Sequence, residues 1–287
     1  MGMCFGVRDA IAKAQEAAEL ESVTILGQLV HNATVLERMR ERGVRFASRP
    51  EDVSTRTAVI TAHGASDKAM ERARSGGLGL IDTTCPLVTY AHRGVRELVA
   101  QGYHPVIIGK RGHVEVNGMT EDLEDYDIVL TKEEIERLKE RSRFGVCSQT
   151  TQPIDRVQGL VSALRERFPG SEVRFIDTVC QPTKQRQTAA TELAGKCDVV
   201  VIVGGSNSNN TRELVETCRG ACRRVYHLQG AADLCREWFE EGDTVGLTAG
   251  TSTPDDLIQG VFAELERLFC KGALCGKVNA VDERRGA

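Results

Sequence analysis

Three cysteines placed just ahead of expected helices are the residues in this sequence that point most directly to chemistry. They are Cys4, Cys85 and Cys180, and the last two close the same motif, Ile-Asp-Thr-x-Cys, after an apolar run. In parallel α/β sheets ligands bind beyond the carboxyl ends of the strands, so cysteines at those ends would face one shared crevice. Three thiolates at one point suit a metal ion or an iron–sulfur cluster, and on a four-iron cube they would leave one iron open to a substrate. The alternative for each cysteine is a small buried side chain.

Histidines and polar loops follow several of the same apolar runs. His31, His63 and His113 each come within a few residues of such a run. Together they could donate N–H groups to an anion or bind a metal, although any one alone is typical of a structural histidine. The segments 206–211 and 251–254 are rich in Ser, Thr and Asn and lie between an expected strand and an expected helix. Because helix N-termini attract phosphate, these features predict a doubly ionised or diphosphate ligand, with plain helix capping as the alternative.

A carboxyl group beside one of these histidines is the candidate acid. Glu115 lies two residues after His113, and on an extended segment two such residues project to the same side. In an apolar, anion-binding crevice the carboxyl group would keep its proton and could act as a general acid. Thr150 follows another strand end and could orient a proton relay. The alternatives are an exposed carboxylate and a helix cap.

Composition excludes several classes of protein. The 287 residues are 41% hydrophobic and 27% charged, with a net charge of −4, as in an ordinary globular protein that favours neither nucleic acid nor an anionic membrane as a partner. No apolar run approaches the ~20 residues of a membrane-spanning helix, and no secretory signal is visible, so we expect a cytoplasmic protein. A disulfide framework for the ten cysteines is then unexpected. We expect inert thiols at Cys218, Cys222, Cys235, Cys270 and Cys275.

Short apolar strands alternate with amphipathic helices along the chain, which predicts βαβ units and parallel sheets. The expected strands lie at 23–27, 57–62, 78–81, 105–109, 144–147, 173–176, 198–203 and 244–247. The repeated cysteine motif divides the chain into three similar α/β domains, 1–82, 83–177 and 178–270, followed by a C-terminal tail, 271–287.

Nine short motifs, in order from residue 2 to about 269, resemble the 4-hydroxy-3-methylbut-2-enyl diphosphate reductases. They are Gly2-Met3-Cys4-Phe5-Gly6-Val7, Leu29-Val30-His31-Asn32, Ala62-His63-Gly64, Asp82-Thr83-Thr84-Cys85-Pro86, Gly112-His113-Val114-Glu115-Val116, Gln149-Thr150-Thr151, Asp177-Thr178-Val179-Cys180, Gly204-Gly205-Ser206-Asn207-Ser208-Asn209-Asn210-Thr211 and Thr248-Ala249-Gly250-Thr251-Ser252-Thr253-Pro254-Asp255. Enzymes of that family make isopentenyl and dimethylallyl diphosphate in the last step of the methylerythritol phosphate pathway.

The resemblance implies a trefoil of three α/β domains around a central [4Fe-4S] cluster with one open iron. It also implies a ferredoxin- or flavodoxin-type electron donor and a small allylic diphosphate substrate. The cluster ligands that it implies are Cys4, Cys85 and Cys180. The diphosphate-binding positions that it implies are His31, His63, His113, Ser208, Asn209, Asn210 and Ser252. Glu115 matches the proton donor, and Thr150 and His113 are the other catalytic positions.

The sequence also departs from the family pattern. The family usually has a β-strand before the Gly-x-Cys motif, and here only three residues precede Cys4. Val114 replaces a usual Pro, Asn117 a usual Glu, and Asn209 a usual Ser. These changes leave open an iron–sulfur reductase or dehydratase of another anionic substrate. A non-catalytic cluster-binding redox protein and a zinc-stabilised module are further alternatives.

Overall fold

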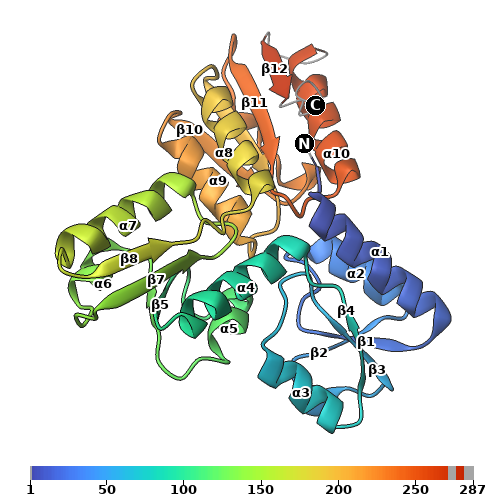
Figure 1. Cartoon of the computed structure of the whole chain (residues 1–287). Helices are drawn as coiled ribbons and strands as arrows, with labels where there is room; N and C mark the ends of the chain where they lie inside the picture. Colours follow the sequence, from blue (N-terminus) through green and yellow to red (C-terminus); the bar gives the residue numbers. More distant parts are fainter. Residues whose placement is uncertain (1, 271–275, 281–287) are drawn as a thin grey trace. The chain divides into compact units, whose positions relative to one another are not determined.

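The computed structural model describes residues 2–270 and 276–280 and contains three parallel sheets of four strands each (Figure 1). The chain divides into two compact units. The C-terminal unit comprises Gln181–Ala287 together with the short segments Met1–Phe5 and His31–Val35. The N-terminal unit comprises Gly6–Val30 and Leu36–Cys180. The three-sheet α/β class expected from the sequence is confirmed.

The first sheet, in the N-terminal unit, has the strand order β2-β1-β3-β4. Its strands are β1 (Val23–Leu26), β2 (Arg45–Ala47), β3 (Thr57–Ile60) and β4 (Gly79–Asp82), and the helices of this region are α1 (Phe5–Leu20), α2 (Ala33–Glu41), α3 (Asp67–Ser75) and the short η1 (Pro50–Asp52). The central strand β3 is buried throughout, as expected for a parallel strand covered on both faces. Helix α1 buries a stripe of small residues at helical spacing, Ala10, Ala14 and Ala17.

The second sheet, in the same unit, has the order β6-β5-β7-β8. Its strands are β5 (His104–Ile108), β6 (Asp127–Val129), β7 (Arg143–Ser148) and β8 (Glu172–Phe175), and its helices are α4 (Pro86–Ala100), α5 (Val114–Thr120), α6 (Lys132–Glu136) and α7 (Ile154–Arg167). Side chains alternate along β5: Val106 and Ile108 join the core under α7, whereas Ile107 joins the core under α4. The period of two therefore gives this sheet a buried layer on each face.

The third sheet, in the C-terminal unit, has the order β10-β9-β11-β12. Its strands are β9 (Val199–Val203), β10 (Arg224–Leu228), β11 (Thr244–Ala249) and β12 (Lys277–Ala280), and its helices are α8 (Gln181–Ala194), α9 (Asn209–Arg219), α10 (Asp255–Cys270), η2 (Ala231–Asp233) and η3 (Arg236–Trp238). The residues of β9 alternate between a core shared with α10 and one shared with α8 and α9. Strand β12 lies in the segment 271–287 that we expected to be a tail, and it pairs with β11. Residues 271–275 and 281–287 of that segment, including Cys275, lie outside the described residues.

All three sheets share one topology, in which the second strand flanks the first and the fourth lies at the opposite edge. The two Ile-Asp-Thr-x-Cys motifs begin on β4 and just after β8, the fourth strands of the first two sheets, and lead into α4 and α8. Each therefore places its cysteine between an edge strand and a helix. The internal repeat in the sequence is thus a repeat in the fold.

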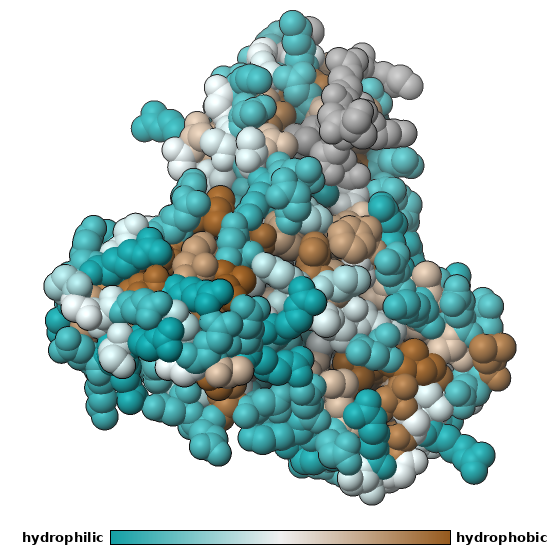
Figure 2. Space-filling model, in the orientation of Figure 1, coloured by the Kyte–Doolittle hydropathy of each residue, from teal (hydrophilic) through white to brown (hydrophobic). Residues whose placement is uncertain are grey.

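The part of the chain that the structure describes has no helix that combines the length and apolar character needed to cross a membrane. On the face shown in Figure 2, hydrophilic side chains separate small apolar patches. Large apolar side chains with substantial exposure include Leu20, Tyr90 and Val99.

Candidate functional site

The loop between β11 and α10 brings together four predicted site residues of the C-terminal unit. The backbone N–H of Cys4 donates to the carbonyl of Thr251 at 3.0 Å. The N–H of Thr251 donates to Oδ1 of Asn210 at 2.9 Å, and the hydroxyl of Ser252 donates to the carbonyl of His31 at 3.2 Å. One loop therefore connects a predicted cluster ligand to three predicted diphosphate-binding positions.

This loop is fixed to the neighbouring strand by two hydrogen bonds and by close packing at two glycines. The N–H of Gly250 and the hydroxyl of Thr253 both donate to the carbonyl of Val203, at 2.9 and 3.0 Å. The side chain of Thr211 lies so close to Gly204 and Gly250 that a Cβ at either glycine would overlap its hydroxyl. No sequence signal marks Thr211 by itself, yet its side chain fills the space between the ends of β9 and β11.

The first residues of α9 supply buried polar groups. Ser208 is the N-cap, and its hydroxyl accepts from the N–H of Thr211 at 3.2 Å. Asn209 and Asn210 follow and are both buried. Nδ2 of Asn210 is buried and has no hydrogen-bond partner among the described residues. Since buried polar groups are almost always paired, this amide is a donor suited to a ligand, at a helix end that already favours anions.

His31 is held in its neutral form. Burial lowers its pKa to about 4, and the positive charge of Arg212 adds to the effect. At neutral pH the ring therefore carries one N–H donor rather than two. A bound dianion would stabilise the charged form and raise this pKa.

The candidate acid lies in the N-terminal unit and is arranged differently from the sequence expectation. His113 and Glu115 do not lie on an extended segment, because His113 caps α5 and Glu115 is in the first turn of that helix. The N–H of Glu115 donates to Nδ1 of His113 at 3.2 Å, so helix capping, and not strand alternation, brings the pair together. The ring of His113 meets that of His63 edge to face, with 6.0 Å between their centroids.

Glu115 is 2% exposed, and its carboxyl group is coupled to a predicted cluster ligand through Thr150. The N–H of Thr150 donates to Oε1 of Glu115 at 2.6 Å, and the carbonyl of Thr150 accepts from the N–H of Cys180 at 3.0 Å. Burial raises the pKa of Glu115 to about 7, although the hydrogen bonds from Thr150 act in the opposite direction. The carboxyl group is thus poised to exchange a proton near neutral pH.

A glycine on α1 lies against the sulfur of Cys85. A Cβ at Gly6 would overlap that Sγ, so the first turn of α1 can lie here only because the residue is glycine. Cys85 caps α4, and its thiol is half-buried. Gly6 comes two residues after Cys4 in the sequence.

His92 is a residue of this region that sequence reasoning missed. It is buried on α4, and its ring would contact a Cβ at Gly64 or at Gly118, at 3.5 and 3.1 Å. Gly64 follows His63, and Gly118 lies on the helix of Glu115, so His92 packs against both elements. No sequence signal marked it, because it does not follow a strand.

The described residues contain no group of three or more His, Cys, Asp or Glu side chains arranged to hold a metal ion. Cys4 belongs to the C-terminal unit, and Cys85 and Cys180 belong to the N-terminal unit, so their convergence stays a prediction. The donor set nevertheless fits an iron–sulfur cluster, since all three thiols are half-buried and that of Cys85 has a glycine beside it. Among the other cysteines, burial raises the pKa of Cys147 and Cys218 to about 12, in keeping with inert thiols.

Comparisons with known proteins point to one family. Residues 1–266 match the profile of the LytB protein family. The 4-hydroxy-3-methylbut-2-enyl diphosphate reductase of Trichlorobacter lovleyi is 37% identical over 269 residues, covering 93% of this chain and 95% of the relative. The enzyme of the same name from Anaeromyxobacter sp. (strain K) is 38% identical over 274 residues, covering 93% of this chain and 96% of that relative.

Solved structures agree with the sequence relatives. The E-1-hydroxy-2-methyl-but-2-enyl-4-diphosphate reductase from Plasmodium falciparum matches with a TM-score of 0.89 at 28% identity, covering 100% of this chain and 92% of that one. A structure of (E)-4-hydroxy-3-methyl-but-2-enyl diphosphate reductase, described as the terminal enzyme of the non-mevalonate pathway, matches with a TM-score of 0.66 at 34% identity, covering 93% and 96% of the two chains. The chain therefore belongs to the LytB family of 4-hydroxy-3-methylbut-2-enyl diphosphate reductases.

Proposed function

We propose that this protein reduces (E)-4-hydroxy-3-methylbut-2-enyl diphosphate to isopentenyl and dimethylallyl diphosphate. The reaction consumes two electrons and two protons, breaks the C–O bond to the 4-hydroxyl group and releases that oxygen as water. The names of the relatives support this substrate. The observation that carries the proposal is the buried acid Glu115, which Thr150 links to Cys180.

Cys4, Cys85 and Cys180 are the residues that we propose to hold a [4Fe-4S] cluster. Such a cluster, when bound by three thiolates, supplies electrons one at a time and a Lewis-acidic iron for the substrate hydroxyl. The hydrogen bond from the N–H of Cys180 to the carbonyl of Thr150 would fix the distance between that ligand and the acid. Ferredoxin or flavodoxin is the class of electron donor that we propose, and the cytoplasm, where thiols stay reduced, is the proposed location.

Glu115 is the proton donor in this mechanism. With a pKa of about 7, a large fraction of the carboxyl groups is protonated at neutral pH. Loss of the hydroxyl as water requires a proton at the leaving oxygen, and a buried neutral carboxyl group delivers it without a charge cost in the ground state. The N–H of Thr150 would then stabilise the carboxylate that remains.

The diphosphate would bind donors from both units. In the C-terminal unit these are the N-terminus of α9 with Ser208, Asn209 and Asn210, and the neutral ring of His31. The hydroxyl of Ser252 would join them by turning its proton from the carbonyl of His31 to the phosphate. In the N-terminal unit they are His63 and His113. The buried Nδ2 of Asn210 is the donor that most needs such a ligand.

The test is turnover of the allylic diphosphate by anaerobically reconstituted protein, with a chemical reductant and mass-spectrometric detection of both products. Glu115→Gln is expected to keep its iron content while turnover falls by roughly 100-fold or more, as for loss of a general acid. The matched control Glu124→Gln removes an exposed carboxylate of the same unit and should leave turnover unchanged. Protein that binds iron but does not consume this substrate would overturn the proposal in favour of another anionic substrate or a cluster carrier.

A further inference from the structure

Arg186 is a buried cation that joins two distant parts of the C-terminal unit. It lies on α8 and is 3% exposed. Its Nη1 donates to the carbonyl of Ala249 at 2.6 Å, and its Nη2 donates to the carbonyl of Gly2 at 3.0 Å. One guanidinium group therefore links the end of β11 to the segment that carries Cys4.

The segment Gly2–Cys4 has no regular secondary structure of its own. Gly2 has φ +114°, which favours glycine, and a Cβ there would overlap the carboxylate of Asp255. On the other side, the N–H of Cys4 donates to the carbonyl of Thr251 at 3.0 Å. The described contacts that place Cys4 on this unit are thus the hydrogen bond to Thr251, the close approach of Gly2 to Asp255, and Arg186.

We propose that Arg186 is a positioning residue for Cys4: its two-pronged contact with Gly2 and Ala249 holds the N-terminal segment so that the thiolate is retained as a cluster ligand. This inference rests on the proposed function, in which Cys4 is such a ligand. Burying a charged group is costly unless it is hydrogen-bonded, so an arginine at this depth calls for a specific task. The planar fork of arginine places two separate nitrogen atoms, and each of them reaches the carbonyl group of a different segment. Lysine carries a single nitrogen on a flexible stem, and that one atom would have to lie within hydrogen-bond distance of both carbonyl groups.

The location of Ala249 extends the effect of Arg186. Ala249 is the last residue of β11, directly before the loop whose Thr251 and Ser252 contact Cys4, Asn210 and His31. The guanidinium group therefore holds the start of this loop, at Ala249, and also the segment Gly2–Cys4, which is hydrogen-bonded to the loop. One side chain, Arg186, thus contacts both the segment that carries Cys4 and the strand end that leads into the loop bound to Cys4.

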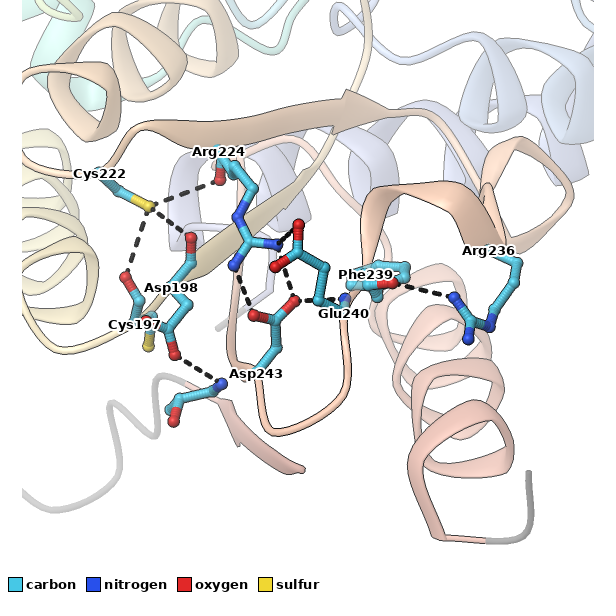
Figure 3. Close-up of polar contacts among 9 residues, drawn as sticks. Cys197, Asp198, Cys222, Arg224, Arg236, Phe239, Glu240 and Asp243 are labelled. Carbon is cyan, nitrogen blue, oxygen red and sulfur yellow. Dashed lines mark hydrogen bonds and ion pairs between the residues drawn. The ribbon is translucent and has the colours of Figure 1, made fainter. Parts of the chain in front are cut away.

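The variants Arg186→Lys and Arg186→Gln test the proposal, with Arg224→Gln as a matched control. Arg224 is another hydrogen-bonded arginine of the C-terminal unit, which forms two bonds with Asp243, at 2.9 and 2.5 Å (Figure 3). The measurement is the rate at which anaerobically reconstituted protein loses iron to a chelator. We expect both Arg186 variants to release iron roughly 10-fold faster or more, as for loss of a hydrogen bond from a charged donor, and the control to stay within about twofold of the parent protein.

The variant Arg186→Lys distinguishes the effect of the shape of the guanidinium group from the effect of its charge. Arg186→Lys keeps the positive charge and loses the fork, so its iron release should match that of Arg186→Gln and exceed that of the parent. Release from Arg186→Lys at the parent rate would overturn the proposal. Thermal unfolding of the iron-free proteins checks for a general loss of stability. A role specific to Cys4 requires that the Arg186 variants be destabilised no more than Arg224→Gln, and a larger loss of stability would count against that role.

A second variant approaches the same contact from the other side. Gly2→Ala would strain the backbone at φ +114° and place a Cβ against the carboxylate of Asp255, which would displace the carbonyl of Gly2 without altering α8. It should also accelerate iron release, and its effect should add only in part to that of Arg186→Lys, since the contact between Gly2 and Arg186 is lost in both variants. Unchanged release in Gly2→Ala, or fully additive effects, would count against the proposal.

The failure of the proposed function can be told apart from the failure of this inference. In iron-free protein, alkylation of Cys4 measured by mass spectrometry should be faster in Arg186→Lys than in the parent, with no change at Cys235, which is exposed and distant in sequence. A parent protein that takes up no iron would refute the cluster while this thiol assay still tests the role of Arg186. Equal alkylation of Cys4 in parent and variant would refute that role.

Discussion

The buried carboxyl group of Glu115 should make the protein less stable as the pH rises, and replacing it with glutamine should remove that effect. Glutamine has nearly the same shape and can still accept the hydrogen bond from Thr150 through its amide oxygen. It cannot ionise. The substitution therefore changes the titration of this position while it preserves the packing.

The size and sign follow from the pKa of Glu115, which burial raises from 4.5 to about 7. Between these two values the folded state holds a proton that the unfolded state releases, so the stability of the parent falls as the pH increases. Each pH unit in this window changes the free energy of unfolding by about 1.4 kcal/mol, which sums to about 3 kcal/mol. Below pH 4.5 both states are protonated, and above about pH 7 both are ionised, so the effect is confined to the window.

The assay is urea unfolding of iron-free protein at several pH values, comparing the parent with Glu115→Gln. The free energy of unfolding of the variant, relative to the parent, should rise by about 3 kcal/mol from pH 4.5 to 7.5 and then stay constant. Glu124→Gln, at an exposed position, should show no such rise. A relative stability of Glu115→Gln that does not change with pH would refute an elevated pKa at this site, and with it the reason for choosing Glu115 as the acid.

Three further substitutions test the site. Gly6→Ala should lower the iron bound per chain, because its Cβ would displace the sulfur of Cys85. Asn210→Asp keeps the acceptor for the N–H of Thr251 but replaces the buried donor with a negative charge, so KM for the diphosphate should rise by roughly 10- to 100-fold with iron content unchanged. Thr211→Val should keep or raise the free energy of unfolding, since the buried hydroxyl of Thr211 has no hydrogen-bond partner among the described residues.

The contrary results are specific to each substitution. Full iron content in Gly6→Ala, measured by colorimetric iron analysis, would mean that the contact of α1 with Cys85 is not needed for cluster binding. An unchanged KM in Asn210→Asp, from initial-rate kinetics, would remove that amide from the substrate site. A loss of more than about 1 kcal/mol in Thr211→Val, from urea unfolding, would mean that its hydroxyl makes a stabilising bond.

The sequence predicted the buried strands far better than the exposed edges. Each of the eight expected strands overlaps one in the structure, and the ones missed are β2, β6, β10 and β12. All four lie at a sheet edge. They are short or interrupted by polar residues, as in Lys277-Val278-Asn279-Ala280, because one side of an edge strand faces solvent. An apolar run is therefore a weak signal for them.

The candidate acid shows where local pattern fails. An isolated His-x-Glu can lie on a strand or at the start of a helix, and its spacing alone predicted an extended segment. The structure makes His113 an N-cap, because its ring nitrogen accepts the N–H of Glu115. The residue types and their proximity were predicted, but the geometry that joins them was not.

Positioning residues were the least predictable part of the site. Arg186, Thr211 and His92 act through contacts with segments far away in the sequence, and none stands at a strand end. Residue type and spacing reveal groups that meet a ligand at the ends of strands. They do not reveal the side chains that hold those groups in place, since such contacts depend on tertiary packing.

The most direct test of the cluster is a Mössbauer spectrum of protein reconstituted anaerobically with ⁵⁷Fe, recorded with and without the allylic diphosphate. Binding by Cys4, Cys85 and Cys180 predicts about four irons per chain, one of which differs from the others and changes its signal when the substrate is added. Protein without iron, or irons whose signals are all unaffected by the substrate, would contradict a three-cysteine cluster at the reaction site.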